Sequence, residues 1–214
     1  AAAVITAIAQ RERCFTVKRE VIRQTPPLPA LRLLTALPRH DIFDNIVQKA
    51  VELGVSRLSP LLSARTVVRF ADEQQTARKL KHWQQVSIAA IKQSGNPFLP
   101  VIDAPCELPQ ALADSASALK IALHPRAEPS LRRLRLPAAG AINLVFGPEG
   151  GFSPEETALL KENGYCLYRL GNNILRLETA IVCALSAVHL LRDEIASCVQ
   201  DRDEPRNPKD GLGG

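Results

Sequence analysis

One stretch in the C-terminal third limits the possible folds more than any other. Ala141–Phe146 is a short apolar run, which is typical of a strand buried on both faces. A Gly-Pro-Glu-Gly-Gly turn follows it. Ser153, Pro154 and Glu156 then have the pattern of a helix N-terminus with a capping box, and Gly164 ends that helix. This helix start is one of the most secure local predictions in the chain.

A second strand and loop follow that helix. Tyr165–Leu170 is expected to form a strand, and Gly171-Asn172-Asn173 has turn chemistry because Asn tolerates left-handed backbone. Ile174 and Leu175 are apolar where a surface turn would be polar. Two interpretations of this pair stay open, namely the wall of a site for a flat ring and a plug in the core. A lone glycine-rich loop is usually only a tight turn, but two loops that follow strands can hold a small ligand on backbone groups.

These segments resemble a known family. The run GPEGGFSPEE, followed by LGNNILRLETA, is similar to the signature of the RsmE family, the 16S ribosomal-RNA uridine-N3 methyltransferases of the SPOUT class. Upstream, NIVQKAVELGV at Asn45–Val55 and IAAIKQSGNPFLP at Ile88–Pro100 fit the same pattern. Because the blocks keep their order and spacing, the resemblance extends from about Leu31 to Arg192, which is most of the chain.

The resemblance implies an α/β fold with a SPOUT-type parallel sheet, a C-terminal deep trefoil knot and the remnant of an N-terminal PUA-like β-barrel. The domains would be residues 1–30 for a partial RNA-binding barrel and linker, residues 31–196 for the methyltransferase domain, and residues 197–214 for a disordered tail. Residues 1–35 contain two expected strands, fewer than the family's barrel needs, so part of the barrel is expected to be missing. The tail is polar and contains Pro and Gly, which predicts disorder.

The resemblance also implies S-adenosylmethionine as the methyl donor, with no metal. The candidate cofactor-binding residues lie in three loops that follow strands: Leu123, His124, Gly147, Pro148, Glu149, Gly150, Leu170, Gly171, Asn172, Ile174, Leu175 and Arg176. His124 replaces the acidic residues that are common there in the family, and Asn173 replaces a common Arg.

Two residues after the second loop are the catalytic candidates. Arg176 is predicted to stabilise the developing oxyanion of the uridine or to grip its phosphate through charge-assisted hydrogen bonds. Glu178 is predicted to orient Arg176 or to cap the following helix, where the helix dipole favours a carboxylate. The sequence leaves the proton acceptor open.

The charge of the chain favours an anionic partner only weakly. The formal net charge is +5 and the pI is about 9.1. Arg65 and Arg19 are the candidates for contact with RNA phosphates. A surface position is the simpler account of Arg65, whereas for Arg19 RNA contact and a solvated strand face are equally open. A further basic group faces either RNA or solvent: Arg126, Arg132, Arg133 and Arg135. The partner that the resemblance implies is 16S rRNA in the assembling small subunit.

The cysteines and the last helix complete the analysis. The five cysteines are odd in number and lack a C-x-x-C pair, which argues against a disulfide framework or a zinc site and fits a reducing cytoplasm. The longest apolar stretch, Ala180–Leu191, is too short to span a membrane. It is apolar on almost all sides, so the core or a second subunit is expected to bury it, in agreement with the homodimer that the resemblance implies.

Three functional hypotheses result. The first is methylation of uridine N3 in 16S rRNA. The second is methylation of another RNA position, such as a ribose 2′-hydroxyl, by a related SPOUT enzyme. The third is a non-catalytic RNA-binding relative.

Overall fold

The computed structural model describes residues 2–9, 14–20, 29–39, 42–68, 70–113 and 117–203, with side chains described between residues 29 and 192. In chain order the elements are β1 Ala2–Ala9, β2 Cys14–Glu20, β3 Ala30–Ala36, α1 Ile42–Glu52, β4 Arg57–Leu62, α2 Glu73–Ser94, β5 Val101–Ile102, β6 Cys106–Glu107, α3 Leu108–Ala113, β7 Leu119–Leu123, η1 Leu131–Arg133, β8 Ala141–Phe146, α4 Pro154–Glu162, β9 Cys166–Tyr168 and α5 Leu177–Asp203.

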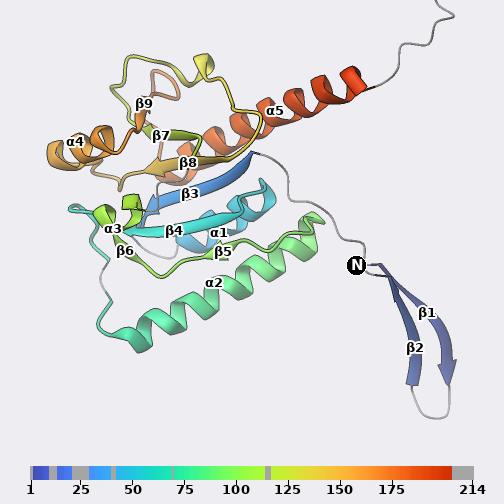
Figure 1. Cartoon of the computed structure of the whole chain (residues 1–214). Coiled ribbons are helices and arrows are strands. Elements are labelled where there is room, and N and C mark those ends of the chain that lie inside the picture. The colour runs from blue at the N-terminus through green and yellow to red at the C-terminus, as the bar shows by residue number, and fades with distance from the viewer. Residues whose placement is uncertain are drawn as a thin grey trace, which may run out of the picture.

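The main sheet is parallel throughout its described pairs. Its strand order is β5-β4-β3-β8-β7-β9, and β6 pairs with β4 at the end of that strand (Figure 1). The predicted α/β fold with a parallel sheet is therefore confirmed. Because parallel strands point the same way, the loops that follow β7, β8 and β9 leave the sheet at one edge.

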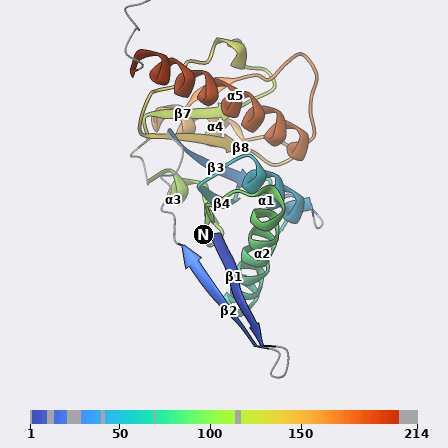
Figure 2. The ribbon, with the colours of Figure 1, turned by 90° about the vertical axis from the view of Figure 1, so that its right-hand side faces the viewer.

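The central strand β8 is buried on both faces, as its apolar run predicts. All of its residues are buried, and its side chains alternate between two apolar clusters. Leu144 joins the cluster that contains α1 and α5, whereas Val145 joins the cluster that contains α3 and α4. The sheet is thus the middle of three layers (Figure 2).

Helix α2 is anchored through α1 rather than through the sheet face. The ring of Trp83 in α2 lies 4.5 Å from the ring of Phe43 in α1, measured between centroids, and both residues are buried. Asp72 caps the N-terminus of α2 by accepting a hydrogen bond from the Gln75 amide, and Gly95 ends it in a left-handed conformation. Helix α2 lies beside β5, at the edge of the sheet opposite β9 (Figure 1).

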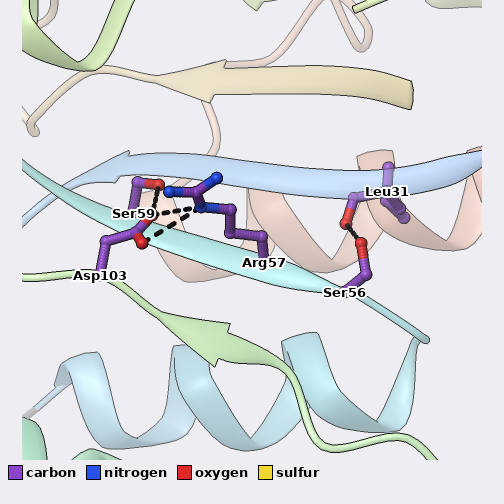
Figure 3. A network of polar contacts seen from close by, with 5 residues as sticks. All are labelled: Leu31, Ser56, Arg57, Ser59 and Asp103. Atoms are coloured by element: carbon purple, nitrogen blue, oxygen red, sulfur yellow. Dashed lines mark hydrogen bonds and ion pairs between the residues drawn. The ribbon is translucent and has the colours of Figure 1, made fainter. Parts of the chain in front are cut away.

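A polar network fixes the β5 edge of the sheet (Figure 3). Arg57 in β4 donates through Nε to both carboxylate oxygens of Asp103, at 2.8 and 3.1 Å, and Ser59 donates to the same carboxylate. Ser56 donates to the carbonyl of Leu31 at 2.9 Å. These bonds join β3, β4 and the segment after β5, so this edge is held by side chains as well as by the backbone ladder.

The two predicted N-terminal strands form a hairpin. Strands β1 and β2 pair antiparallel from Ala2 opposite Glu20 to Ala9 opposite Cys14, with a register shift between Ile5 and Ala7. Residues 21–28, between β2 and β3 in the chain, lie outside the described residues.

The predicted tail, residues 197–214, needs a correction at its start. Helix α5 continues to Asp203, so residues 197–203 are helical, and residues 204–214 lie outside the described residues. The physical reason is that no helix breaker occurs in this part of α5 before Pro205. Strand β6 and helix α3 were not predicted, because each is too short to show a period.

Candidate functional site

The loops at the carboxyl edge of β7, β8 and β9 surround one cavity of about 740 Å³. Residues 123–126 line it after β7, residues 146–152 line it after β8, and Leu170, Gly171 and residues 173–175 line it after β9. The two glycine-bearing loops of the sequence therefore border the same space. In the sheet, β7 lies between β8 and β9. The loops after these three strands therefore leave the sheet next to one another and meet at the cavity.

The loop after β8 is tightly folded. The amide of Gly151 donates to the carbonyl of Pro148 at 2.7 Å, and Gly151 has a φ of +70°, which favours glycine. A Cβ atom on Gly147 would lie only 3.1 Å from the amide nitrogen and the ring of Phe152. Because Gly147 and Gly151 have no side chains, the chain can make this tight turn where it lines the cavity.

Side chains from other strands hold this loop in place. Glu149 accepts a hydrogen bond from the amide of Arg39, which follows β3, at 3.2 Å. Glu156 in α4 accepts from the amides of Ser153 and Ala64, each at 2.8 Å. The guanidinium of Arg65 donates to the carbonyl of Gly150. The loop is thereby tied to the ends of both β3 and β4.

The N-terminus of α4 has the predicted capping box. The Ser153 hydroxyl accepts from the Glu156 amide at 3.1 Å while the Glu156 carboxylate bonds back to Ser153. Ser153 also donates to Glu155 at 2.7 Å, and this bond lowers the pKa of the fully exposed Glu155 carboxyl.

The loop after β9 presents an apolar surface to the cavity. Ile174 is 85% exposed and Leu175 is 36% exposed, and both line the cavity. The interpretation of this pair as a core plug is therefore wrong for Ile174. An exposed branched side chain beside a cavity can instead contact the face of a planar ligand.

His124 lines the same cavity and is hydrogen-bonded through both its backbone and its ring. Its amide donates to the carbonyl of Tyr168 at 2.9 Å, and its Nδ1 accepts from the amide of Arg126 at 3.2 Å. Because Nδ1 acts as an acceptor, the neutral ring carries its proton on Nε2. Nε2 is therefore a hydrogen-bond donor in that state.

The structure brings most of the candidate cofactor residues together. Those that line the cavity are Leu123, His124, Gly147, Pro148, Glu149, Gly150, Leu170, Gly171, Ile174 and Leu175. Asn172 lines a neighbouring cavity of about 660 Å³ instead. Arg65, an RNA candidate, also lines the main cavity, whereas Arg19 lies in β2 and its side chain is outside the described residues.

Arg176 and Glu178 line neither cavity. The carbonyl of Arg176 accepts from the Ala180 amide at 2.8 Å, so Arg176 stands at the start of α5, and its exposed guanidinium has no bond to any described residue. Glu178 lies half-buried in the first turn of α5, where a carboxylate interacts favourably with the helix dipole.

One face of α4 was missed by the sequence analysis. Four of its residues line the cavity at positions i, i+3, i+4 and i+7: Pro154, Thr157, Ala158 and Lys161. This spacing is the signal that was available, since it defines one side of a helix. It was missed because the face mixes small, polar and charged residues and so has no hydrophobic period. Arg126, noted only as part of a basic group, also lines the cavity.

The described residues contain no cluster of His, Cys, Asp and Glu able to hold a metal ion. In the same part of the chain, every helix is too short or too polar to cross a membrane.

In open parallel α/β sheets, ligands bind outside the carboxyl ends of the strands, so the cavity identifies this chain as a ligand-binding α/β protein. The matching family model, described as an RNA methyltransferase domain, covers residues 25–189. The chain belongs to this RNA methyltransferase family.

Individual relatives of the chain identify the group within this RNA methyltransferase family. It is similar to ribosomal RNA small subunit methyltransferase E of Mycobacterium bovis, with 30% identity over 82% of this chain and 70% of that protein. The protein of the same name from Aquifex aeolicus is 32% identical, over 79% of this chain and 77% of that one. The resemblance to the RsmE family is therefore confirmed.

A solved structure supports the same family assignment. Ribosomal RNA small subunit methyltransferase E from Neisseria gonorrhoeae, bound to S-adenosyl methionine, superposes with a TM-score of 0.74 at 31% identity, over 82% of this chain and 72% of that one.

Proposed function

We propose that this protein transfers the methyl group of S-adenosylmethionine to N3 of a uridine in 16S ribosomal RNA. The observation that carries the proposal is the convergence of the two glycine-bearing loops on one cavity, in a chain of the RNA methyltransferase family. Relatives named for small-subunit rRNA methylation support the choice of substrate, and a relative with S-adenosyl methionine bound supports the choice of donor.

The cavity suits the proposed donor. Its volume of about 740 Å³ is in the range of cofactor sites, which is roughly 300–1,000 Å³. Ile174 and Leu175 offer apolar contact to an adenine ring, while the turn from Gly147 to Gly150 offers backbone amides and carbonyls. In this proposal Leu123, His124, Leu170 and Gly171 complete the binding surface.

For this reaction the protein needs to position the two substrates and to stabilise the negative charge that develops on the uridine. The sulfonium supplies a methyl group that is already activated. The residues of the chain must align the uridine N3 with that methyl carbon and exclude water. The N3 proton leaves to an acceptor, and negative charge develops on the neighbouring carbonyl oxygens. Arg176 follows the cavity-lining Leu175 in the chain, and its guanidinium has no bond to any described residue. We propose that Arg176 stabilises this charge and that Glu178 stabilises the start of α5.

The finer architecture is also proposed. Residues 31–196 form the methyltransferase domain, with a trefoil knot near its C-terminal end, and residues 1–30 belong to a PUA-like RNA-binding unit that includes the β1–β2 hairpin. Two copies associate through α5, which exposes Thr179, Cys183 and Leu190 in the single chain. The protein acts in the cytoplasm on the assembling small subunit.

The first experiment uses a strain that lacks the gene. Nucleosides from its 16S rRNA are analysed by mass spectrometry, and the expected result is loss of 3-methyluridine, restored by the wild-type gene. Arg176→Gln is expected to slow methyl transfer by roughly 100-fold, as for loss of one charge-stabilising donor. Arg78→Gln, at an exposed position on α2, is the matched control and is expected to restore the nucleoside.

The other hypotheses give different results. Loss of a 2′-O-methylated nucleoside instead would assign a different acceptor atom. Failure of the purified protein to bind S-adenosylmethionine in calorimetry would identify a non-catalytic RNA-binding relative. An unchanged 16S methylation pattern in the deletion strain would overturn the proposal.

A further inference from the structure

A second cavity, of about 660 Å³, adjoins the proposed cofactor site and is lined by three arginines. It is bounded by Ser130, Arg132, Arg133, Arg169, Leu170, Gly171 and Asn172. We propose that this arginine cavity binds a backbone phosphate of the rRNA strand, next to the nucleotide that receives the methyl group. This inference rests on the proposed function and adds to it the position at which the substrate strand is gripped.

The three arginines come from two segments that the backbone joins. Arg132 and Arg133 belong to η1, and Arg169 follows β9. The amide of Leu131 donates to the carbonyl of Arg169 at 2.9 Å, and the amide of Arg169 donates to the carbonyl of Pro129 at 3.0 Å. Ser130 pairs with Arg169 as an isolated parallel bridge. The positions of the arginine backbones are therefore set by the fold.

Within the described part of the chain, the arginine charges have no partner. The described residues that line the cavity include no Asp or Glu. The guanidinium groups of Arg132, Arg133 and Arg169 make no ion pair or hydrogen bond with any residue that the structure describes. Arg132 and Arg133 are also exposed. Cations that line one cavity repel one another, so in this proposal an anion between them would stabilise the arrangement.

Phosphate is the anion that fits this set. Guanidinium groups bind phosphate oxygens in pairs of charge-assisted hydrogen bonds, and arginine is the usual residue for nucleic-acid phosphates. The net charge of +5 and the cationic residues that line the main cavity, Arg65, Arg126 and Lys161, are in keeping with a nucleic-acid strand.

The two cavities share a wall, which places the phosphate relative to the reaction. Leu170 and Gly171 line both, and a Cβ on Gly171 would meet nothing within 4 Å. A strand whose target base enters the main cavity can therefore continue across Gly171 toward the arginines. The arginines would fix the strand without reading its sequence, because phosphates carry no base identity.

The test replaces the three arginines in the full chain: Arg132→Gln, Arg133→Gln and Arg169→Gln together. The charge-matched control replaces three exposed cations on α2, at the opposite edge of the sheet: Arg78→Gln, Lys81→Gln and Lys92→Gln. Both variants have three fewer positive charges than the wild type. Affinity for a 16S rRNA fragment is measured at several salt concentrations, together with S-adenosylmethionine binding by calorimetry and the kcat and KM of methyl transfer.

The arginine variant is expected to bind the RNA roughly tenfold or more weakly, as for loss of a hydrogen bond to a charged group. Its plot of log affinity against log salt concentration is expected to be shallower by about 0.7 for each phosphate that the variant no longer binds. KM for RNA rises while kcat and S-adenosylmethionine affinity stay at the wild-type values. The control variant keeps the wild-type RNA affinity to within a small electrostatic loss.

Several results would overturn the inference. An equal loss of affinity in the control would mean that only net charge matters. Weaker S-adenosylmethionine binding in the arginine variant would assign the cavity to the carboxylate of the cofactor. Binding of inorganic phosphate by the wild type, with unchanged RNA affinity in the variant, would assign it to free phosphate. If the triple variant does not fold, the double variant Arg132→Gln and Arg133→Gln, at exposed positions, decides by the same measurements.

The outcome separates this inference from the proposed function. A wild-type protein that does not methylate 16S rRNA contradicts the function. A wild-type protein that does methylate it, alongside an arginine variant with normal RNA affinity and salt dependence, contradicts only the arginine cavity.

Discussion

Gly147 is the residue at which the site leaves least room for a side chain. A Cβ there would lie 3.1 Å from the backbone nitrogen of Phe152, whose ring is buried. Gly147→Ala is therefore expected to destabilise the protein by about 1–3 kcal/mol, the usual cost of overpacking. The measurement is the free energy of unfolding in urea.

Gly150→Ala is the matched control in the same loop. A Cβ on Gly150 would meet only the flexible side chain of Arg65, at 3.3 Å, which can move aside. We expect a change of less than about 0.5 kcal/mol, the range of surface substitutions. Equal costs for the two alanines would contradict the assignment of the tight contact to Gly147.

At the scale of elements, the capping box of α4 links a helix to a neighbouring loop. Ser153→Ala removes one cap and is expected to cost about 1 kcal/mol. Glu156→Ala is expected to cost more, because it also frees the Ala64 amide beside Arg65. Thermal unfolding of the two variants checks this order.

Glu162→Ala is the control for loss of a carboxylate from the same helix. Glu162 is exposed in the last turn of α4, where the dipole disfavours negative charge, so its removal is expected to leave the Tm unchanged or raise it slightly. A Glu156→Ala variant as stable as Glu162→Ala would show that the bond to Ala64 contributes nothing.

At the scale of the whole molecule, the exposed side of α5 tests the proposed dimer. Leu190 is 65% exposed in the single chain. If a second copy covers it, Leu190→Glu buries a charge in an apolar contact and raises the dimer dissociation constant by roughly 100-fold or more. Sedimentation velocity over a range of protein concentrations measures the shift to monomer.

Leu99→Glu provides the comparison, since Leu99 is 54% exposed in the segment before β5, away from α5. It is expected to sediment as the wild type does. The proposed interface through α5 fails if Leu190→Glu and wild type have the same mass at every concentration.

Much of the fold was predictable because its signals are local. A few adjacent residues specify each of three features: the apolar run of β8, the capping box of α4, and the two ends of α2 at Asp72 and Gly95. The disordered tail was predicted to start at residue 197, whereas α5 continues to Asp203, because a polar composition does not end a helix in the absence of a breaker before Pro205. The short β6 and α3 depend on tertiary contacts and have no local pattern.

The sequence by itself determined the longer strands and helices and marked both glycine-bearing loops, because backbone preference and apolar period act over a few residues. Only the tertiary structure decided that β7 lies between β8 and β9 and so brings these loops to one cavity. It also decided that Ile174 faces outward and that Arg169 joins Arg132 and Arg133. The reason is that neighbours in a sheet are chosen by packing between residues far apart in the chain.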